Sequence, residues 1–377
     1  MNCIYQEICG GCPLRQMSDS QYRQHKTERF SRLASAIQQP NIKLGDPIFI
    51  ADGLRRRAEL TFAYSKGKIL LGFNSQQSHN LIAIEQCRSL TPKINHNLSA
   101  IRDFLQNFCS IKTTQKQKTK LITSSVNSGE IWITEAENGL DILLETDISL
   151  SLDHRMEISD FAAHNPDIIR VSHGRKNSNI ETVVEKSKPC IDISGQKIFI
   201  PAGTFLQASS AGQQALINLV LKYIGSSTGN IADLFCGIGT FSFPLAANIK
   251  NKITAVDSSP ELLSAFKQSI NYLTVSNINI LQKNLFKYPL DTRELPQFDI
   301  IVFDPPRAGA AAQVKQIVAL NEADKPQKIV AISCNPHTFI NDANTLIQGG
   351  YKLLEMTMVD QFVYANHFEL VALFEKS

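Results

Sequence analysis

Long hydrophobic runs are missing from this sequence of 377 residues: no window of about 18 consecutive apolar residues occurs in it. The N-terminus also lacks a basic start followed by an apolar segment, which argues against a secretion signal. Because the formal net charge is only +3, any nucleic-acid-binding surface must be a local patch. We therefore expect a cytoplasmic, monomeric protein that does not bind a membrane.

Disulfide bonds are not expected either, because the eight cysteines of a cytoplasmic protein stay reduced. Metal binding and catalysis are then the uses to consider for these thiols. With 43% hydrophobic residues, a chain of this length can bury a full core without cross-links. The size favours an enzyme built of several parts over a small binding module.

The chain from about residue 200 onward alternates short apolar runs with amphipathic stretches of helical length, a pattern typical of a parallel sheet covered by helices. The predicted strands are 230–234, 252–256, 278–281, 298–303, 328–333, 351–359 and 367–374. The predicted helices between them are 209–223, 260–273, 310–320 and 338–348. The sequence before residue 200 differs, because its short alternating segments predict an antiparallel β region, and these segments are 58–64, 68–73, 129–134 and 139–145.

A glycine-rich turn follows the first strand of the C-terminal region, in the motif Asp233-Leu-Phe-Cys-Gly-Ile-Gly-Thr240. Gly237 and Gly239 allow the backbone to turn tightly beside a ligand. Ser242 stands where a dinucleotide-binding fingerprint has its third glycine. The turn therefore favours a methyl donor, which has no pyrophosphate, over NAD.

Two polar residues at the ends of the next strands could complete such a cofactor site. Asp257 follows Gly239 by 18 positions, where a carboxylate can accept hydrogen bonds from a ribose diol. Asn284 follows the third strand and is suitably placed for an adenine.

Candidate catalytic residues follow the fourth and fifth strands. Asp304-Pro-Pro-Arg307 ends the fourth strand, at the carboxyl edge where open α/β sheets bind ligands. Enzymes that methylate an amino group of adenine or cytosine have an aromatic residue after this Asp-Pro-Pro corner, so Arg307 makes that chemistry the second choice. Cys334 ends the fifth strand, and its thiol is expected in the same crevice.

A cysteine at this place suits methylation of uracil at C5, a carbon that is too weak a nucleophile to attack a sulfonium methyl group. Addition of a thiolate to C6 places negative charge on C5 and so permits the methyl transfer. A base must then remove the C5 hydrogen before the thiolate leaves. Glu369 is the candidate base, and His367 is expected on the same strand face.

In these motifs the C-terminal half resembles the RNA uracil-C5-methyltransferase family, which includes tRNA T-loop enzymes and 23S rRNA uridine enzymes. The matching segments are Phe205-x-Gln207, Asp233–Thr240, Asp304–Arg307, Ser333–Pro336 and Asp360–Glu369. The resemblance implies that S-adenosylmethionine is the methyl donor, that Cys334 is the nucleophile and that Glu369 is the base. It also implies a donor and uracil pocket lined by Gln207, Phe235, Asp257, Asn284 and Asp304. From the glycine-rich turn we add Gly237, Gly239 and Thr240 to the expected cofactor site.

Four cysteines near the N-terminus form a possible metal site: Cys3, Cys9, Cys12 and the distant Cys87. Their number suits either an all-cysteine zinc site or a [4Fe-4S] cluster, and the residues alone do not decide between the two. Their spacing resembles the iron-sulfur site of the 23S rRNA branch, which the tRNA branch lacks. The resemblance therefore implies a [4Fe-4S] cluster and a 23S rRNA substrate.

RNA is the expected partner. Arg55, Arg56 and Arg57 are candidates for phosphate contacts, which position a nucleic acid without reading its sequence. A second basic cluster comprises Lys112, Lys116, Lys118 and Lys120. The target uracil must leave its stack to reach Cys334, so a single-stranded loop or a remodelled hairpin is the expected substrate.

We expect three segments. Residues 1–45 form a cluster-binding lobe, completed by Cys87, and residues 46–200 form a β-rich α+β region that contacts RNA. Residues 201–377 form a Rossmann-like class I methyltransferase domain with a mixed, mostly parallel sheet. The alternatives to a 23S rRNA enzyme are a tRNA uracil-C5-methyltransferase, an adenine N6-methyltransferase and an inert RNA-binding homologue.

Overall fold

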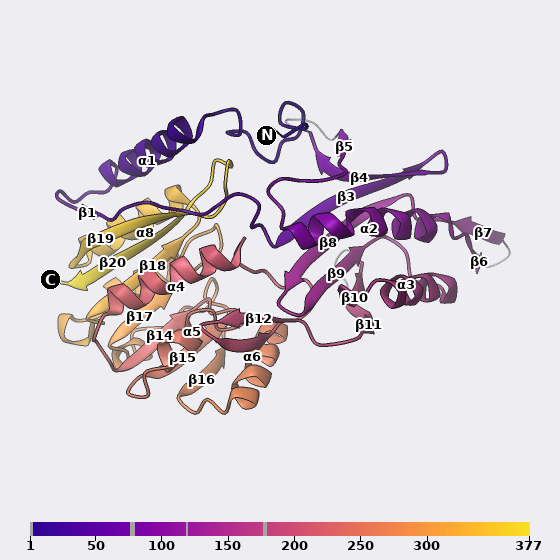
Figure 1. Ribbon diagram of the computed structural model, residues 1–377. Coiled ribbons are helices and arrows are strands. Elements are labelled where there is room, and N and C mark those ends of the chain that lie inside the picture. Colours follow the sequence, from indigo (N-terminus) through magenta and orange to yellow (C-terminus); the bar gives the residue numbers. More distant parts are fainter. Residues whose placement is uncertain (1–2, 76–79, 118–119, 176–178) are drawn as a thin grey trace. The chain divides into compact units, whose positions relative to one another are not determined.

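The computed structural model describes residues 3–75, 80–117, 120–175 and 179–377, and these fall into two compact units (Figure 1). The N-terminal unit comprises Met1–Gln16, Asp52–Ile191 and Ile200–Ser209. The C-terminal unit comprises Met17–Ala51, Asp192–Phe199 and Ser210–Ser377. Each unit is therefore assembled from segments that are distant in the sequence.

The described part of the C-terminal unit is built on a nine-stranded sheet with the order β1-β19-β20-β18-β17-β14-β15-β16, in which β2 also pairs with β19 (Figure 1). The strands are β1 (Lys43–Leu44), β2 (Ile48–Phe49), β14 (Asn230–Leu234), β15 (Lys252–Asp257), β16 (Ile278–Gln282), β17 (Ile300–Phe303), β18 (Lys328–Ser333), β19 (Tyr351–Asp360) and β20 (Glu369–Lys376). The strands from β14 to β18 pair in parallel, and β20 is antiparallel to both of its neighbours.

Helices cover this sheet, and their sequences explain their limits. The helices are α1 (Asp19–Ser35), α4 (Ser210–Ile224), α5 (Ser242–Ala246), α6 (Pro260–Leu273), α7 (Ala311–Val318) and α8 (Pro336–Gln348), with the single turns η1 (Leu295–Gln297) and η2 (Glu322–Asp324). In α6 the Ser259 hydroxyl accepts a hydrogen bond from the Leu262 amide, and Pro260 occupies the first turn. All four residues of β17 are apolar and buried, as expected of a parallel strand covered on both faces.

The N-terminal unit contains, in its described residues, a seven-stranded sheet with the order β11-β10-β9-β8-β3-β4-β5. Its strands are β3 (Arg57–Ser65), β4 (Lys68–Asn74), β5 (Leu81–Ala83), β8 (Ser128–Ala136), β9 (Gly139–Glu145), β10 (Ile168–Gly174) and β11 (Glu181–Glu185). Two helices, α2 (Pro92–Ser110) and α3 (Leu152–His164), pack against this sheet. The strands β6 (Thr113–Gln117) and β7 (Lys120–Ser124) form a separate antiparallel pair. A short further sheet consists of β12 (Cys190–Ile193) and β13 (Gln196–Phe199).

The predicted mixed, mostly parallel sheet of the C-terminal region is confirmed, with local differences elsewhere. The central region is not wholly antiparallel, because β9 and β10 pair in parallel. The helix α3 lies between these two strands in the sequence. The two compact units also differ from the three expected segments, because α1 belongs to the C-terminal unit. Phe30 and Leu33 of α1 are buried in the core of that unit, which explains the assignment.

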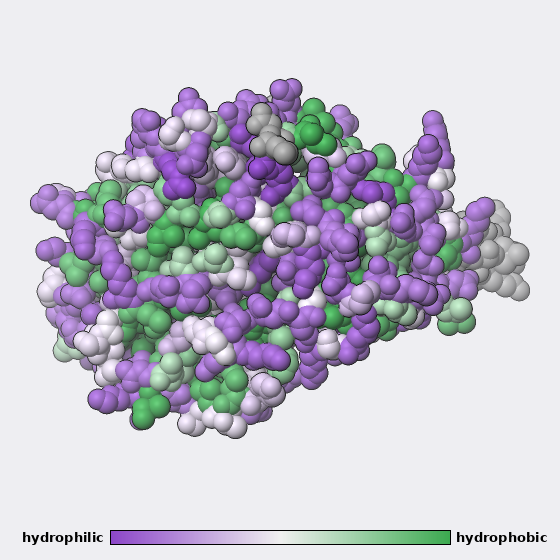
Figure 2. Space-filling view, in the orientation of Figure 1, coloured by the Kyte–Doolittle hydropathy of each residue, from purple (hydrophilic) through white to green (hydrophobic). Residues whose placement is uncertain are grey.

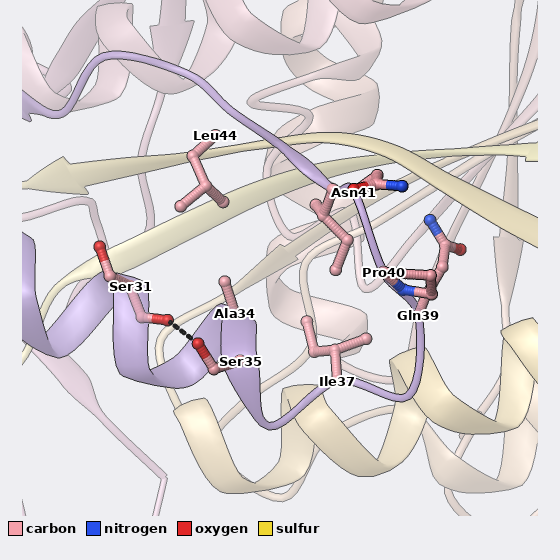
Figure 3. Close-up of a pocket in the computed structure, with 9 residues that line it drawn as sticks. Ser31, Ala34, Ser35, Ile37, Gln39, Pro40, Asn41 and Leu44 are labelled. Carbon is pink, nitrogen blue, oxygen red and sulfur yellow. Dashed lines mark hydrogen bonds between the residues drawn. The ribbon is translucent and has the colours of Figure 1, made fainter.

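The surface is mostly hydrophilic on the face that is shown (Figure 2), and one described pocket lies in the C-terminal unit. Figure 2 shows hydrophilic side chains over most of the visible face, with hydrophobic ones between them. One pocket lies between the end of α1 and β1 (Figure 3). It is lined by uncharged residues: Ser31, Ala34, Ser35, Ile37, Gln39, Pro40, Asn41, Ile42 and Leu44. Among the described residues, no helix is both long and apolar enough to span a membrane.

Candidate active site

The glycine-rich turn lies directly after β14 and differs at its two glycines. A Cβ atom on Gly237 would meet no other atom within 4 Å, so open space borders this residue. A Cβ atom on Gly239 would lie 2.5 Å from the ring of Phe266, so this position has no room for a side chain. Both residues have positive φ angles, 56° and 91°. The first glycine thus leaves room beside the turn, and the second allows close packing beneath it.

Asp257 at the end of β15 connects this turn to the next one. Its Oδ2 atom accepts a hydrogen bond from the Gly237 amide at 3.0 Å, and its Oδ1 atom accepts one from the Ser259 amide at 2.9 Å. The side chain is half-buried. These bonds fix a carboxylate beside the open space at Gly237, with acceptor capacity left for a ligand hydroxyl.

Ser242, which stands in place of a third glycine, has a structural role that the sequence did not reveal. Its hydroxyl donates a 2.5 Å hydrogen bond to Oδ2 of Asp233, which is completely buried. The Oδ1 atom of Asp233 has no hydrogen-bond partner, and burial raises the pKa of this carboxyl group to about 7. This bond links Asp233, near the end of β14, to Ser242, the first residue of α5.

An aromatic pair lies near the same turn. The rings of Phe235 and Phe286 have centroids 5.4 Å apart, and Phe286 is exposed. The Asn284 side-chain oxygen accepts hydrogen bonds from the Phe286 and Lys287 amides, so it also shapes the turn after β16. Phe286 was not among the residues predicted for the cofactor site, although an aromatic residue two positions after Asn284 was the available signal. Thr240 is half-buried where the glycine-rich turn leads into α5.

The three candidate catalytic groups come from neighbouring strands. Asp304 directly follows β17, Cys334 directly follows β18, and Glu369 is the first residue of β20. In the sheet β18 lies between β17 and β20. Because β20 is antiparallel, its beginning lies at the edge where β17 and β18 end. The structure therefore brings together three groups that are separated by more than 60 residues of sequence in total.

Burial and neighbouring charge raise the pKa values of these groups. The pKa of the Cys334 thiol is raised to about 11, mainly by burial and then by the charges of Glu369 and Asp304, while Arg307 opposes the rise. Burial raises the pKa of Asp304 to about 7. Since one small site cannot easily hold several negative charges, a nearby positive charge is needed to favour the thiolate.

Glu369 is almost completely buried. Its Oε1 atom accepts a hydrogen bond from the side-chain Nε2 atom of Gln361 at 3.3 Å, while its Oε2 atom has no hydrogen-bond partner. Burial and the charge of Asp304 raise the pKa of Glu369 to about 8. Glu369 is therefore a buried group on an inner strand of the sheet.

His367 does not lie on the strand face on which the sequence placed it. The strand β20 begins two residues later, and the His367 side chain is exposed in the preceding loop. Its backbone oxygen accepts a 2.6 Å hydrogen bond from Lys26. The pairing of β20 with β19 starts at Glu369, opposite Val359.

The arginine cluster divides into different environments within the N-terminal unit. Arg56 is buried, and its Nε atom donates a 3.1 Å hydrogen bond to the backbone oxygen of Gln207, so the expectation of a phosphate contact is wrong for Arg56. Arg57 lies over the ring of Phe205, and Arg55 is exposed. Gln207 itself is buried and its expected place in the donor and uracil pocket stays a prediction. Of the lysine cluster, Lys112 is exposed, the side chains of Lys116 and Lys120 are not described, and Lys118 lies outside the described residues.

The four N-terminal cysteines line one small cavity of the N-terminal unit: Cys3, Cys9, Cys12 and Cys87. The Arg15 guanidinium lies 3.8 Å from the Cys12 sulfur and is held by an ion pair with Asp52. Ser89 lies 3.4 Å from the same sulfur. Among the described residues, however, no group of three or more His, Cys, Asp or Glu side chains has a geometry that could bind a metal ion. The other cysteines outside the catalytic candidates, Cys109, Cys190 and Cys236, are buried.

Known proteins are similar to this chain over most of its length. Residues 19–377 match the family model described as tRNA (uracil-5-)-methyltransferase. An uncharacterized RNA methyltransferase of Agrobacterium fabrum is 33% identical over 98% of this chain and 82% of its own length. A 23S rRNA (uracil(1939)-C(5))-methyltransferase of Edwardsiella ictaluri is 28% identical over 100% of this chain and 81% of its own length.

A solved structure shows the same fold. The tRNA (uracil-54, C5)-methyltransferase of Pyrococcus abyssi, in complex with S-adenosyl-L-homocysteine, matches with a TM-score of 0.72 at 19% identity. The match covers 97% of this chain and 85% of the other.

Proposed function

Since the chain belongs to the tRNA (uracil-5-)-methyltransferase family and is an S-adenosylmethionine-dependent RNA methyltransferase, we propose that it forms 5-methyluridine in 23S rRNA. Cys334 is the nucleophile and Glu369 is the base. The observation that carries this proposal is the convergence of Asp304, Cys334 and Glu369 from adjacent strands at one sheet edge. A half-buried thiol beside a buried carboxyl group offers the nucleophile and the base that C5 methylation requires.

The reaction proceeds through a covalent bond to the RNA. The Cys334 thiolate adds to C6 of the uracil, and the electron pair of the C5–C6 double bond becomes an enolate with negative charge on C5. S-adenosylmethionine supplies the methyl group that C5 then takes up. Glu369 removes the remaining C5 hydrogen, the double bond re-forms, and the C6–sulfur bond breaks to return the thiolate.

The residues near the glycine-rich turn fit the methyl donor. Asp257 offers a fixed carboxylate to the ribose diol of the donor. The open space at Gly237 leaves room for the donor beside the turn. The rings of Phe235 and Phe286 offer apolar faces to an adenine. When bound, the positively charged sulfonium of the donor would lower the pKa values of nearby acidic groups and so would favour the thiolate of Cys334.

The choice of 23S rRNA rests on the four-cysteine pattern and on the similarity to the Edwardsiella enzyme. Deleting the protein from its host should remove 5-methyluridine from a position of 23S rRNA and leave tRNA unchanged. Mass spectrometry of nuclease fragments from both RNA classes measures this. Loss of 5-methyluridine from tRNA alone would instead support the tRNA alternative.

Cys3, Cys9, Cys12 and Cys87 are proposed to hold a [4Fe-4S] cluster. Two features support a cluster here: all four residues are cysteines, and they line one cavity. Arg15 also places a positive charge near the Cys12 sulfur, which favours a thiolate ligand. An anaerobic preparation is expected to contain about four irons per chain and to be brown.

Cys12→Ser should lose most of this iron, as measured by metal analysis and visible absorbance. Cys190→Ser is the matched control, because this buried thiol donates to Asn138, as a serine hydroxyl can too. Stoichiometric zinc in anaerobic wild-type protein contradicts the cluster assignment.

A further inference from the structure

The helix α1 carries a lysine that is completely buried. The Lys26 ammonium donates hydrogen bonds to Oδ1 of Asp360 at 2.8 Å and to the backbone oxygen of His367 at 2.6 Å. Burial lowers the pKa of Lys26, whereas the Asp360 carboxylate raises it. A buried ion pair of this kind adds little stability compared with apolar side chains of the same size. Its presence therefore calls for a role other than stability.

One helical turn earlier, Tyr22 occupies the other oxygen of the same carboxylate. The Tyr22 hydroxyl donates to Oδ2 of Asp360 at 2.5 Å and accepts a hydrogen bond from the Tyr364 amide at 2.8 Å. Tyr364 has a φ angle of 60°, which is uncommon for a residue other than glycine. The centroids of the two tyrosine rings are 4.7 Å apart. The helix thus stabilises a strained backbone position in the middle of a loop.

The loop held in this way, residues 361–368, joins β19 to β20 and leads directly to Glu369 (Figure 1). The helix bonds Asp360 just before the loop, Tyr364 in its middle and His367 near its end. At the start of the loop, Gln361 donates the hydrogen bond to the Glu369 carboxyl group. The loop therefore sets both the backbone position of Glu369 and the orientation of its side chain.

We propose that Tyr22, Lys26 and Asp360 are positioning residues for Glu369: they hold loop 361–368 in the conformation from which this carboxylate reaches the C5 hydrogen. Apolar packing could not do this, because the anchors bind specific backbone atoms, the Tyr364 amide and the His367 oxygen. The inference rests on the proposed role of Glu369 as the base. Proton transfer needs the base within hydrogen-bond reach, so a small displacement slows it strongly.

Tyr22→Phe in the full-length protein tests the proposal, because it removes one hydroxyl and keeps the Lys26–Asp360 ion pair. On ordinary RNA we expect release of product to slow about 10-fold or more, with accumulation of the methylated covalent adduct. Trapping on RNA that contains 5-fluorouracil needs no proton removal, and its rate should stay within about threefold of wild type. Both are followed with radiolabelled S-adenosylmethionine on denaturing gels.

Tyr223→Phe is the matched control. Its buried hydroxyl lies 2.7 Å from the hydroxyl of Thr357, which lies on β19 three residues before Asp360. This variant should resolve the adduct and form the fluorouracil complex at wild-type rates.

Resolution of the adduct by Tyr22→Phe at the wild-type rate overturns the inference, while the proposed function stands. Equal losses of trapping and resolution also overturn it, because they indicate a general structural role. If wild-type protein methylates RNA but never traps the fluorouracil substrate, the Cys334 and Glu369 mechanism itself fails, and the inference fails with it.

Discussion

Cys334→Ala is expected to reduce methylation at least about 1000-fold and to abolish the covalent complex with RNA that contains 5-fluorouracil. Without the thiol no charge develops on C5, so the methyl group has no acceptor. Fluorine at C5 cannot be removed as a proton, so wild-type protein should remain bound to this RNA through Cys334 after methyl transfer. A denaturing gel with labelled RNA shows the complex as a shifted band.

Cys109→Ala is a suitable control for this experiment, because it removes a thiol that is fully buried in the core of the N-terminal unit. This variant should still form the complex. A shifted band with Cys334→Ala would mean that another group attacks C6. Methylation by wild-type protein without any trapped complex would instead favour transfer to an amino group, the chemistry of the adenine alternative.

Glu369→Gln should leave the enzyme attached to ordinary RNA. The thiol still adds and C5 still accepts the methyl group, but the amide cannot take the C5 hydrogen, so release of product should slow about 100-fold or more. The substitution keeps the side-chain volume at a buried site. Quenching single-turnover reactions and separating free from protein-bound methylated RNA measures the release.

The pH dependence provides a second measurement of the same role. Only the deprotonated carboxylate accepts a proton, and the pKa of Glu369 is raised to about 8. Release by wild-type protein should therefore accelerate as the pH rises through about 8, whereas release by Glu369→Gln should not follow this curve.

Glu375→Gln, on the same strand but half-buried near Lys328, is the matched control and should behave like wild type. Free turnover by Glu369→Gln at the wild-type rate would remove Glu369 as the base.

The strands and helices of the C-terminal unit could be predicted closely because their signals are local. The run 230–234 is β14 as predicted, and α6 has the predicted limits, since Ser259 and Pro260 mark its start. Some boundaries differ from the prediction. The last strand begins at Glu369 and not at position 367, because its pairing with β19 starts at Glu369, opposite Val359.

Charged residues show the same limit more clearly. Lysine and arginine are mostly exposed in proteins, so the sequence favours surface roles for Lys26 and Arg56. Both are buried here, because Asp360 and the backbone oxygen of Gln207 lie at their polar ends. The Asp360 partner is 334 residues away from Lys26 along the chain, and no local pattern could reveal it.

The amino-acid pattern alone was enough to identify the candidate groups: a glycine-rich turn after a strand, a thiol and an aspartate at strand ends, and a glutamate near the C-terminus. Residue type and strand periodicity are local properties, so they can be read without a structure. The antiparallel placement of β20 beside β18, which brings Glu369 to the ends of parallel strands, depends on the complete fold. The complete fold also decided the raised pKa values of Cys334 and Glu369, because burial and neighbouring charge depend on residues that the fold assembles.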